Sequence, residues 1–225
     1  KKNLSFAENF FHMCFGKVPN KEIVKAFDVS LILYAEHSFN VSTFTARTIT
    51  SSLSDIHGAI TGAIASLKGP LHGGANEEVM HMMNKIKKPE NALKWINNAL
   101  SKKEVVMGFG HRVYKSGDSR VPTMEKYFKN VSKIKSDKKF IKIYNIVKKV
   151  MIDKKNIHPN VDYPTGPTYH LMGFDTDFFT PIFVTSRITG WSAHIMEQHA
   201  ANKLIRPLSK YSGQKHRKVM LLNQR

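Results

Sequence analysis

The chain has 225 residues, of which 41% are hydrophobic, enough for a sizeable core in one or two domains. No apolar run is long enough to cross a membrane and no signal or transit peptide is recognisable, so we expect no membrane partner. The single cysteine, Cys14, excludes an intramolecular disulfide and suits a reducing compartment, the mitochondrial matrix and the cytoplasm alike. It stands between Met13 and Phe15, which predicts a small core residue. Because the sequence opens with Lys1 rather than Met, we expect it to be part of a longer protein.

The formal net charge of +18 would suit a nucleic-acid partner. Many of the lysines, however, fall in residues 126–155 at helical spacing between apolar residues, which is typical of the solvated face of amphipathic helices. The sequence has no zinc-finger spacing, no RNP-type aromatic motif and no separate basic tail. We therefore expect no nucleic-acid partner, and note that a positive field also favours anionic small molecules.

Apolar residues recur at helical rather than alternating spacing, which predicts an all-α fold. The segment 21–36 is apolar nearly all round, as in a helix buried in a large core. Small residues such as Gly58 and Gly62 within 51–67 favour a tight contact between two helices. The predicted helices are residues 4–16, 21–36, 51–67, 76–87, 90–101, 122–136, 137–155 and 178–203.

The predicted helix at 21–36 runs into Glu36-His37-Ser38-Phe39-Asn40-Val41-Ser42-Thr43. A histidine at the end of a buried helix, followed by an asparagine and hydroxyl residues, is consistent with a polar site in an apolar setting. Capping of two helices, with Ser42 or Thr43 beginning the second, is the alternative interpretation.

A histidine also stands in a glycine-rich turn, Gly69-Pro70-Leu71-His72-Gly73-Gly74-Ala75-Asn76. Three glycines and a proline fix a tight backbone path. The helix that begins near Asn76 turns its positive end toward His72, which favours a neutral ring that can donate a hydrogen bond. A plain helix–turn–helix connection with an incidental histidine would explain the same residues.

Residues 104–120 contain Gly108-Phe109-Gly110-His111-Arg112 and, further on, Arg120. The two glycines would bring backbone N–H and C=O groups within reach of a ligand, although the stretch lacks the dinucleotide and P-loop patterns. A short β-like excursion with a basic rim is the alternative.

A polar, turn-rich stretch at 158–168 carries Asp162, which we expect in an irregular loop between helices. A carboxylate in such a loop commonly serves only as a turn former or a cap. On the long helix that follows, Arg187 shares a face with Phe183 and Trp191. A buried arginine needs an anionic partner, either a carboxylate of the protein or one of a ligand.

Three loops between helices thus carry His72, His111 and Asp162. Three arginines are available to bind anions: Arg120, Arg187 and Arg206. Arginine clamps suit a di- or tricarboxylate, while two histidine donors and a carboxylate base suit proton removal next to a carbonyl followed by carbon–carbon bond formation. The histidines lack the spacing of zinc ligands, so we expect no metal and no further cofactor.

The stretches around these three residues resemble, in the same order, the three catalytic motifs of the citrate synthase family. The motifs read Gly69-Pro70-Leu71-His72-Gly73-Gly74-Ala75-Asn76, Gly108-Phe109-Gly110-His111-Arg112-Val113-Tyr114 and Asn160-Val161-Asp162. Ala35-Glu36-His37 with Asn40 and Ser42 is similar to the oxaloacetate-binding histidine segment of that family. The resemblance covers nearly the whole chain, and the ordered motifs make it highly specific.

The resemblance implies a transferase that condenses acetyl-CoA or propionyl-CoA with oxaloacetate, giving citrate or 2-methylcitrate and free CoA, as in the tricarboxylic acid cycle. Asp162 would be the base, His72 the donor that stabilises the enol, and His111 the group that polarises the ketone. Oxaloacetate would be held by His37, Arg120, Arg187 and, from the second subunit of a homodimer, Arg206. The coenzyme A site would be lined by Leu71, Gly73, Met107, Gly108, Phe109 and Gly110.

The family fold is an all-α structure of two domains. The resemblance places residues 1–72 and 165–225 in the large domain and residues 73–164 in the small domain, with the catalytic loops between them. Family members are longer, so we expect the large domain to be incomplete at its N-terminus and activity to be low unless the remaining part is supplied.

Some segments look more like 2-methylcitrate synthases than typical citrate synthases, namely residues 162–167, 179–183 and 189–198. Asp118-Ser119-Arg120 stands where many members have Asp-Pro-Arg, so the arginine is kept and only its loop differs. The alternative to an active enzyme is a catalytically impaired protein of this fold that binds anionic partners. The three intact catalytic residues favour the enzyme.

Overall fold

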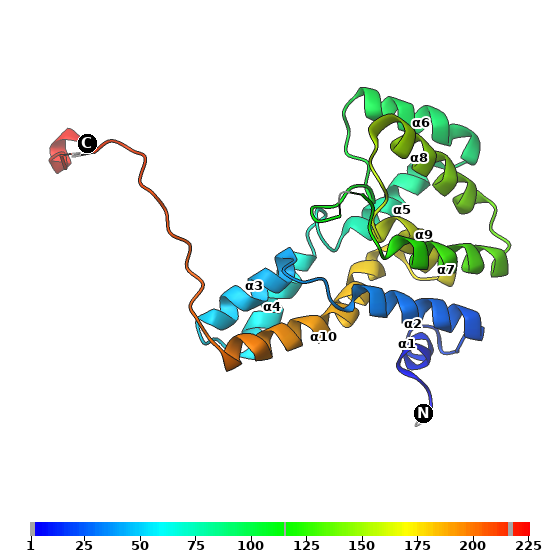
Figure 1. Ribbon diagram of the computed structural model, residues 1–225, viewed down its shortest axis with the longest axis horizontal. Coiled ribbons are helices and arrows are strands. Elements are labelled where there is room, and N and C mark those ends of the chain that lie inside the picture. Colours follow the sequence, from blue (N-terminus) through cyan, green and yellow to red (C-terminus); the bar gives the residue numbers. More distant parts are fainter. Residues whose placement is uncertain (1–2, 115, 216–217) are drawn as a thin grey trace.

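The computed structural model describes residues 3–114, 116–215 and 218–225, which form α-helices joined by turns and loops (Figure 1). The helices are α1 (Phe6–Phe15), α2 (Lys21–Ala35), α3 (Val41–Ser51), α4 (Ile56–Leu67), α5 (Ala75–Ile86), α6 (Pro89–Ser101), α7 (Val121–Ile134), α8 (Lys139–Lys155), α9 (Asp162–Met172) and α10 (Phe179–Ala200), with short 3₁₀ helices at Thr176–Phe178 and Leu222–Gln224. Apart from an isolated bridge between Phe109 and Pro159, this part of the chain contains no β-structure, so the all-α prediction is confirmed. No helix within it is long and apolar enough to span a membrane.

Polar side chains fix where several helices begin. The Ser5 hydroxyl accepts a hydrogen bond from the Glu8 N–H, and the Glu8 carboxylate accepts one from the Ser5 N–H, which together form a capping box at the start of α1. Asn40 accepts from the Thr43 N–H at 3.1 Å and so starts α3. Asp55 does the same for Gly58 at the start of α4.

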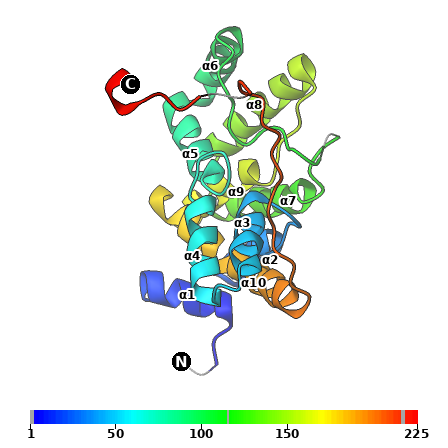
Figure 2. The same cartoon turned by 90° about the vertical axis from the view of Figure 1, so that its left-hand side faces the viewer.

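Helix α10 is the central support of one end of the molecule, because α2, α3 and α4 all pack against it. Figures 1 and 2 show α6 and α8 at the opposite end, with α7 and α9 in between. A Cβ at Gly62 of α4 would lie 2.2 Å from Cδ1 of Ile49 of α3, so the small residues of 51–67 permit a close contact within this chain. The predicted domain boundaries fall in the turn before α5 and in the first turn of α9, and the division stays a prediction.

Two expectations from the sequence are wrong. Residues 162–172 form helix α9, not an irregular loop. Pro164 lies in its first turn, where a backbone N–H would have no partner within the helix, and the surrounding core buries Tyr163 and Tyr169 completely. Cys14 is exposed on α1 and takes no part in the core.

Beyond α10 the chain leaves the helical body in an extended tail (Figure 1). Asn202 and Ile205 still bind Ser51 at the end of α3, through hydrogen bonds of 3.1 and 3.0 Å. After these contacts, apolar side chains such as Leu208 and Leu222 are exposed. The tail therefore makes few contacts with the core of its own chain.

Candidate active site

Six of the residues predicted for catalysis or oxaloacetate binding line one cavity of about 790 Å³, namely His37, His72, His111, Arg120, Asp162 and Arg187. They come from the segment after α2, the turn before α5, the loop before α7, the first turn of α9 and the middle of α10. Leu71 and Gly110 contribute to the same wall. Nowhere in the described part of the chain do three or more His, Cys, Asp or Glu side chains gather in a way that could hold a metal ion.

Asp162 is the first residue of α9, and a phenol holds its carboxylate. Tyr34 donates a hydrogen bond of 2.6 Å to Oδ1 of Asp162. Burial raises the pKa of Asp162 to about 6, although the hydrogen bond from Tyr34 and the positive charge of Arg120 act in the opposite direction. The carboxylate is therefore still largely ionised at neutral pH, and it is a stronger base than an exposed aspartate.

His72 is fixed in the turn between α4 and α5. Its N–H donates to the carbonyl of Gly69 at 2.9 Å, and a Cβ on the next residue, Gly73, would lie 2.6 Å from the carbonyl oxygen of Leu67. Only glycine therefore allows this turn to close on α4. The Nε2 atom of His72 accepts a hydrogen bond of 3.2 Å from the Ser42 N–H. Because a backbone N–H only donates, the proton of the neutral ring is on Nδ1.

The protonation state of His72 depends on its buried surroundings. Burial lowers its pKa to about 4, and the positive charge of Arg187 acts in the same direction. The hydroxyl of Ser42 lies 2.8 Å from Nε2 of His72 and also 2.8 Å from Oδ1 of Asn40, so two acceptors compete for its proton. The indole N–H of Trp191 donates to the same hydroxyl at 3.1 Å. Side chains of α3 and α10 thus hold His72 as a neutral ring with one defined tautomer.

His111 and His37 are neighbours in the cavity wall, and their rings are in contact. Nδ1 of His111 accepts hydrogen bonds from the Val113 and Tyr114 N–H groups at 3.0 and 3.2 Å, which places the proton of the neutral ring on Nε2. That atom lies 3.1 Å from Nε2 of His37. Burial, with the charge of Arg120, lowers the pKa of His37 to about 4. His37 is therefore a neutral acceptor for the Nε2–H of His111.

A carboxylate that the sequence did not single out anchors Arg120. The guanidinium donates from Nε to Oδ1 of Asp118 at 3.0 Å and from Nη2 to Oδ2 at 2.7 Å. Asp118 also accepts from the Val161 N–H at 3.0 Å. Burial alone would raise the pKa of Asp118, but the hydrogen bonds and charge of Arg120 outweigh it and lower that pKa. The pair ties Arg120 to the residue that precedes Asp162, so both groups face the cavity from fixed positions.

Arg187 is almost completely buried, with 1% of its surface exposed. Its Nε donates to the carbonyl of Tyr34, and its guanidinium lies over the ring of Phe183, 4.7 Å from the centroid. Burial and the charge of Arg120 lower its pKa to about 10, so it is still cationic. Its Nη1 atom is buried and has no hydrogen-bond partner among the described residues. A buried cation with an unpaired donor beside a cavity is suited to an anionic ligand.

The predicted coenzyme A residues are only partly in the cavity wall. Leu71 and Gly110 line it, whereas Gly73, Met107, Gly108 and Phe109 do not. The glycine-containing loop pairs instead with residues 158–160: the Gly110 N–H donates to His158 at 2.8 Å, and the Gly108 carbonyl accepts from the Asn160 N–H at 2.9 Å. These backbone groups are therefore already hydrogen-bonded within the protein, and their predicted contact with CoA stays a prediction.

Arg206 lies outside this cavity, on the extended tail beyond α10. The tail leads away from the cavity of its own chain (Figure 1). The assignment of Arg206 to the site of a second subunit stays a prediction.

Three residues that shape the site were not predicted as functional: Tyr34, Asp118 and Trp191. Tyr34 and Trp191 look like ordinary core aromatics, since each lies in an apolar helical segment. Asp118 stands two residues before Arg120, close enough in sequence for a carboxylate and a guanidinium in one loop to pair. That spacing was the one feature of the sequence that could have indicated a role for any of the three.

The fold and the cavity define a class of all-α proteins that gather histidine, arginine and aspartate side chains between helix ends. Residues 1–208 match the family described as citrate synthase, C-terminal domain, and the chain belongs to the citrate synthase family. It is 57% identical over 217 residues to a citrate synthase of Mycolicibacterium smegmatis, covering 96% of this chain and 58% of that protein. It is 58% identical over 214 residues to a 2-methylcitrate synthase of Mycobacterium tuberculosis H37Rv, covering 95% and 54%. The chain thus spans little more than half the length of these relatives.

Solved structures of citrate synthases share the fold. The crystal structure of citrate synthase from Thermotoga maritima superposes with a TM-score of 0.89 at 37% identity, covering 100% of this chain and 62% of that one. Citrate synthase from Thermoplasma acidophilum, in a ternary complex with carboxymethyl coenzyme A and oxaloacetate, superposes with a TM-score of 0.91 at 37% identity, covering 99% of this chain and 61% of that one. The prediction of a citrate-synthase-like fold is confirmed.

Proposed function

We propose that this chain carries the catalytic residues of an enzyme that condenses an acyl-CoA with oxaloacetate. Acetyl-CoA would give citrate and propionyl-CoA would give 2-methylcitrate, with release of free CoA in both cases. A relative named citrate synthase and a relative named 2-methylcitrate synthase match this chain at nearly the same identity, 57% and 58%. The structural relative from Thermoplasma acidophilum was solved with a CoA derivative and oxaloacetate, which supports this pair of substrates.

One observation carries the proposal: His72, His111 and Asp162 open into the same cavity, where His72 is neutral and Asp162 is a base of raised pKa. Asp162 removes a proton from the carbon next to the thioester carbonyl. His72 donates its Nδ1–H to the thioester oxygen as the enol forms. A neutral donor of this kind stabilises an enol without being deprotonated, and its tautomer is fixed by the Ser42 N–H.

The second half of the reaction uses the opposite side of the cavity. Arg120 and Arg187 bind the carboxylates of oxaloacetate, and the buried Nη1 of Arg187 gains a partner when they do. His37 lies beside them, and the Nε2–H of His111 turns from His37 to the ketone oxygen. As the enol carbon attacks the ketone carbon, His111 supplies a proton to the alkoxide. Water then hydrolyses the condensed thioester, which releases CoA and the tricarboxylate.

A dimer would complete this site. The exposed side chains of Leu71, Phe39 and Val113 form an apolar rim at the mouth of the cavity, where the acyl-CoA would enter. Arg206 would reach the carboxylates of the ligand in a partner subunit, since its own tail leads away from its own cavity. Closure of the small domain, residues 73–164, on the large one would exclude water after oxaloacetate binds.

The test is the release of free CoA by the full-length protein with oxaloacetate and either acetyl-CoA or propionyl-CoA. We expect the rate of CoA release to fall by about 10³-fold or more for Asp162→Asn, which keeps the shape of the side chain but removes the base. Asp177→Asn, on the exposed 3₁₀ helix before α10, is the matched control and should leave the rate unchanged.

The two donors differ by one methyl group, and a hydrophobic pocket discriminates such a difference by only about 1–3 kcal/mol. We therefore expect measurable CoA release with both acyl-CoAs. No CoA release from either donor, with no effect of Asp162→Asn, would contradict the proposal. It would favour a non-catalytic protein of this fold that binds anions.

A further inference from the structure

One stripe of helix α10 contacts the segment that carries His37. Arg187, Trp191 and His194 are spaced by four and three residues, so they lie on the same face of the helix. Arg187 donates to the Tyr34 carbonyl, Trp191 to the Ser42 hydroxyl, and His194 lies 3.0 Å from a carboxylate oxygen of Glu36. A Cβ on Gly190 would lie 2.3 Å from the carbonyl oxygen of Ala35. A glycine at this position lets the two backbones come close enough for these contacts.

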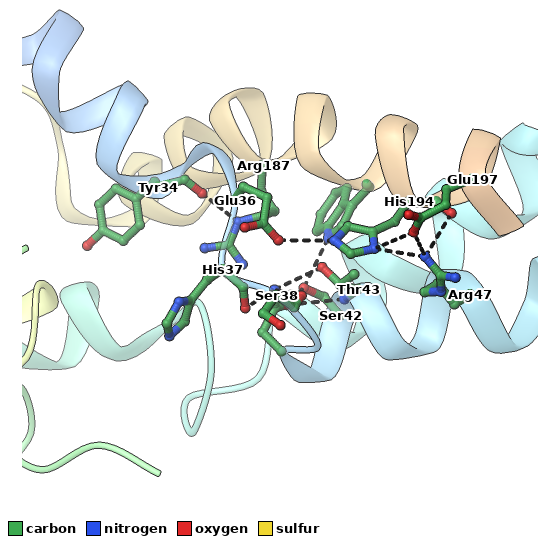
Figure 3. Close-up of polar contacts among 12 residues, drawn as sticks. Tyr34, Glu36, His37, Ser38, Ser42, Thr43, Arg47, Arg187, His194 and Glu197 are labelled. Atoms are coloured by element: carbon green, nitrogen blue, oxygen red, sulfur yellow. Dashed lines mark hydrogen bonds and ion pairs between the residues drawn. The ribbon is translucent and has the colours of Figure 1, made fainter. Parts of the chain in front are cut away.

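His194 is held between two partners of opposite charge (Figure 3). Its Nε2 faces Glu36, and its Nδ1 lies 3.0 Å from Nη1 of Arg47 on α3. A guanidinium only donates, so Nδ1 is the acceptor and the proton of the neutral ring is on Nε2, where it is donated to Glu36. Arg47 is held in turn by an ion pair with Glu197, one turn further along α10.

Glu36 joins the end of α2 to His37 in an extended conformation, with φ −146° and ψ 147°. Successive side chains of an extended backbone point to opposite sides. Figure 3 shows this arrangement, with Glu36 directed toward His194 and His37 directed away from it. Fixing the carboxylate of Glu36 therefore directs the imidazole of His37 into the cavity.

The carboxylate of Glu36 is otherwise weakly held, since 54% of its side chain is exposed. Burial acts to raise the pKa of Glu36, but hydrogen bonds from His194 and from the Ser38 N–H outweigh it and lower that pKa. The ionised carboxylate thus gains from the contact with His194. The imidazole of His194 is more enclosed, since only 16% of its side chain is exposed. The ring of Phe39 packs edge-on against it, with 5.8 Å between the two ring centroids.

We propose that His194 is a positioning residue for the oxaloacetate half of the site, acting through Glu36 on His37. The inference rests on the proposed function for the identity of the ligand. It differs from a general stabilising role because it concerns one half of the site: His72 and Asp162 are held by Ser42 and Tyr34, not by Glu36. Loss of His194 therefore weakens oxaloacetate binding and leaves the acyl-CoA side intact.

The experiment compares His194→Ala, His194→Gln and the control His199→Ala in the full-length protein. Gln keeps a donor for Glu36 and an acceptor for Arg47, and His199 is an exposed histidine on the same helix. For His194→Ala we expect the KM for oxaloacetate to rise about tenfold while the KM for the acyl-CoA stays within about twofold. His194→Gln should recover most of the oxaloacetate affinity, and His199→Ala should resemble wild type. Equal loss on both substrates, or no rescue by Gln, would overturn the inference.

Glu36→Ala tests the same contact from its other side and leaves the partly enclosed imidazole of His194 in place. The single variant should reproduce the effect of His194→Ala, and the double variant should be no worse than either, because both changes break one contact. Additive effects would show that His194 acts on something else. A lowered Tm in His194→Ala alone, without a change in oxaloacetate KM, would mark a structural tie between α3 and α10 and overturn the positioning role.

Oxaloacetate binding, measured by calorimetry without acyl-CoA, separates this inference from the proposed function. If wild type binds oxaloacetate but releases no CoA, the condensation proposal fails, and the change in oxaloacetate Kd between the variants decides the role of His194. If wild type binds no oxaloacetate, both fail.

Discussion

Tyr34 and Asp162 are 128 residues apart in the sequence and are joined by a hydrogen bond of 2.6 Å between the phenol and the carboxylate. The bond links the last turn of α2 to the first turn of α9. It stabilises the ionised form of Asp162 and so limits the rise of its pKa that burial causes. The basicity of the carboxylate is therefore set by burial on the one hand and by the Tyr34 hydroxyl together with the charge of Arg120 on the other.

Replacing Tyr34 with Phe removes only the hydroxyl, since the ring still packs against Phe183 at 4.1 Å between centroids. The pKa of Asp162 should then rise above its value of about 6. A hydrogen bond to a charged group contributes about 1.5 kcal/mol, which corresponds to a shift of about one unit in pKa. Because the base must be ionised, the acid limb of the pH profile of kcat/KM should move to higher pH by about that amount.

Tyr127→Phe on α7 is the matched control, because Tyr127 contributes to the edge of the core and does not line the cavity. Its pH profile should coincide with that of wild type. A Tyr34→Phe profile that falls at all pH values without a shift would contradict the assigned role of the hydroxyl.

Ser42 links the indole of Trp191 to the imidazole of His72. Ser42→Ala should lower kcat about tenfold, because His72 keeps only the backbone N–H that fixes its tautomer and Trp191 loses its acceptor. The KM for oxaloacetate should change little, since Ser42 does not bind the groups that face that substrate. Steady-state kinetics with each substrate varied in turn would measure both effects.

Ser132→Ala provides a control for a buried serine. Its hydroxyl is buried on α7 and has no hydrogen-bond partner among the described residues, so its removal should be neutral. If Ser42→Ala and Ser132→Ala behave alike, the hydroxyl of Ser42 has no catalytic part.

Most of the helices and the residues around the cavity could be predicted from the sequence, because their signals are local. Helical spacing of apolar residues marks the amphipathic helices, and the glycines around His72 mark a turn that few other residues could follow. Helix α9 could not be predicted in this way. Its Pro-Thr-Gly-Pro composition is typical of a turn, and only the surrounding core, which buries Tyr163 and Tyr169, makes it a helix.

Tyr34 and Trp191, which hold the site residues in position, could not be predicted as functional either, for a different reason. Tyr34 and Trp191 act through contacts between residues more than a hundred positions apart, and a buried aromatic residue at helical spacing reads first as core. The polar atom of such a residue shows its partner only once the fold is known. His72, His111 and Asp162 could be placed at one site from the sequence because each lies in a motif with several unusual residues in a row.

Arg187→Met should remove the response of the protein to oxaloacetate while leaving the unliganded fold largely intact. The change deletes a buried cation whose Nη1 has no partner among the described residues, and such charges often contribute little to stability. Oxaloacetate at 100 times its Kd should stabilise wild type by about 2.7 kcal/mol, seen as a rise in Tm, and this rise should vanish in the variant. A variant that unfolds without ligand would instead show that the guanidinium supports the core. Lys68→Met, which removes an exposed charge, is the control and should keep the rise in Tm.

Asp162→Asn should stabilise the folded protein at high pH and lose that advantage at low pH. The folded pKa of about 6 is raised above the ordinary value of 3.8, so Asp162 favours folding fully below about pH 4 and loses that contribution as the pH rises through 6. At pH 8 the penalty for ionising the buried carboxylate is about 3 kcal/mol, and at pH 5 it is about half of that. Asn carries no charge and can still accept the hydrogen bond from Tyr34.

Urea denaturation of both proteins at pH 5 and pH 8 measures this difference. The free energy of unfolding of Asp162→Asn, relative to wild type, should increase by about 1–2 kcal/mol between the two pH values. The comparison between pH values cancels any constant cost of the amide group, which is why it is more informative than either measurement alone. A difference that does not change with pH would show that the pKa of Asp162 is not raised in the folded protein, and with it the basis for its role as the catalytic base would be lost.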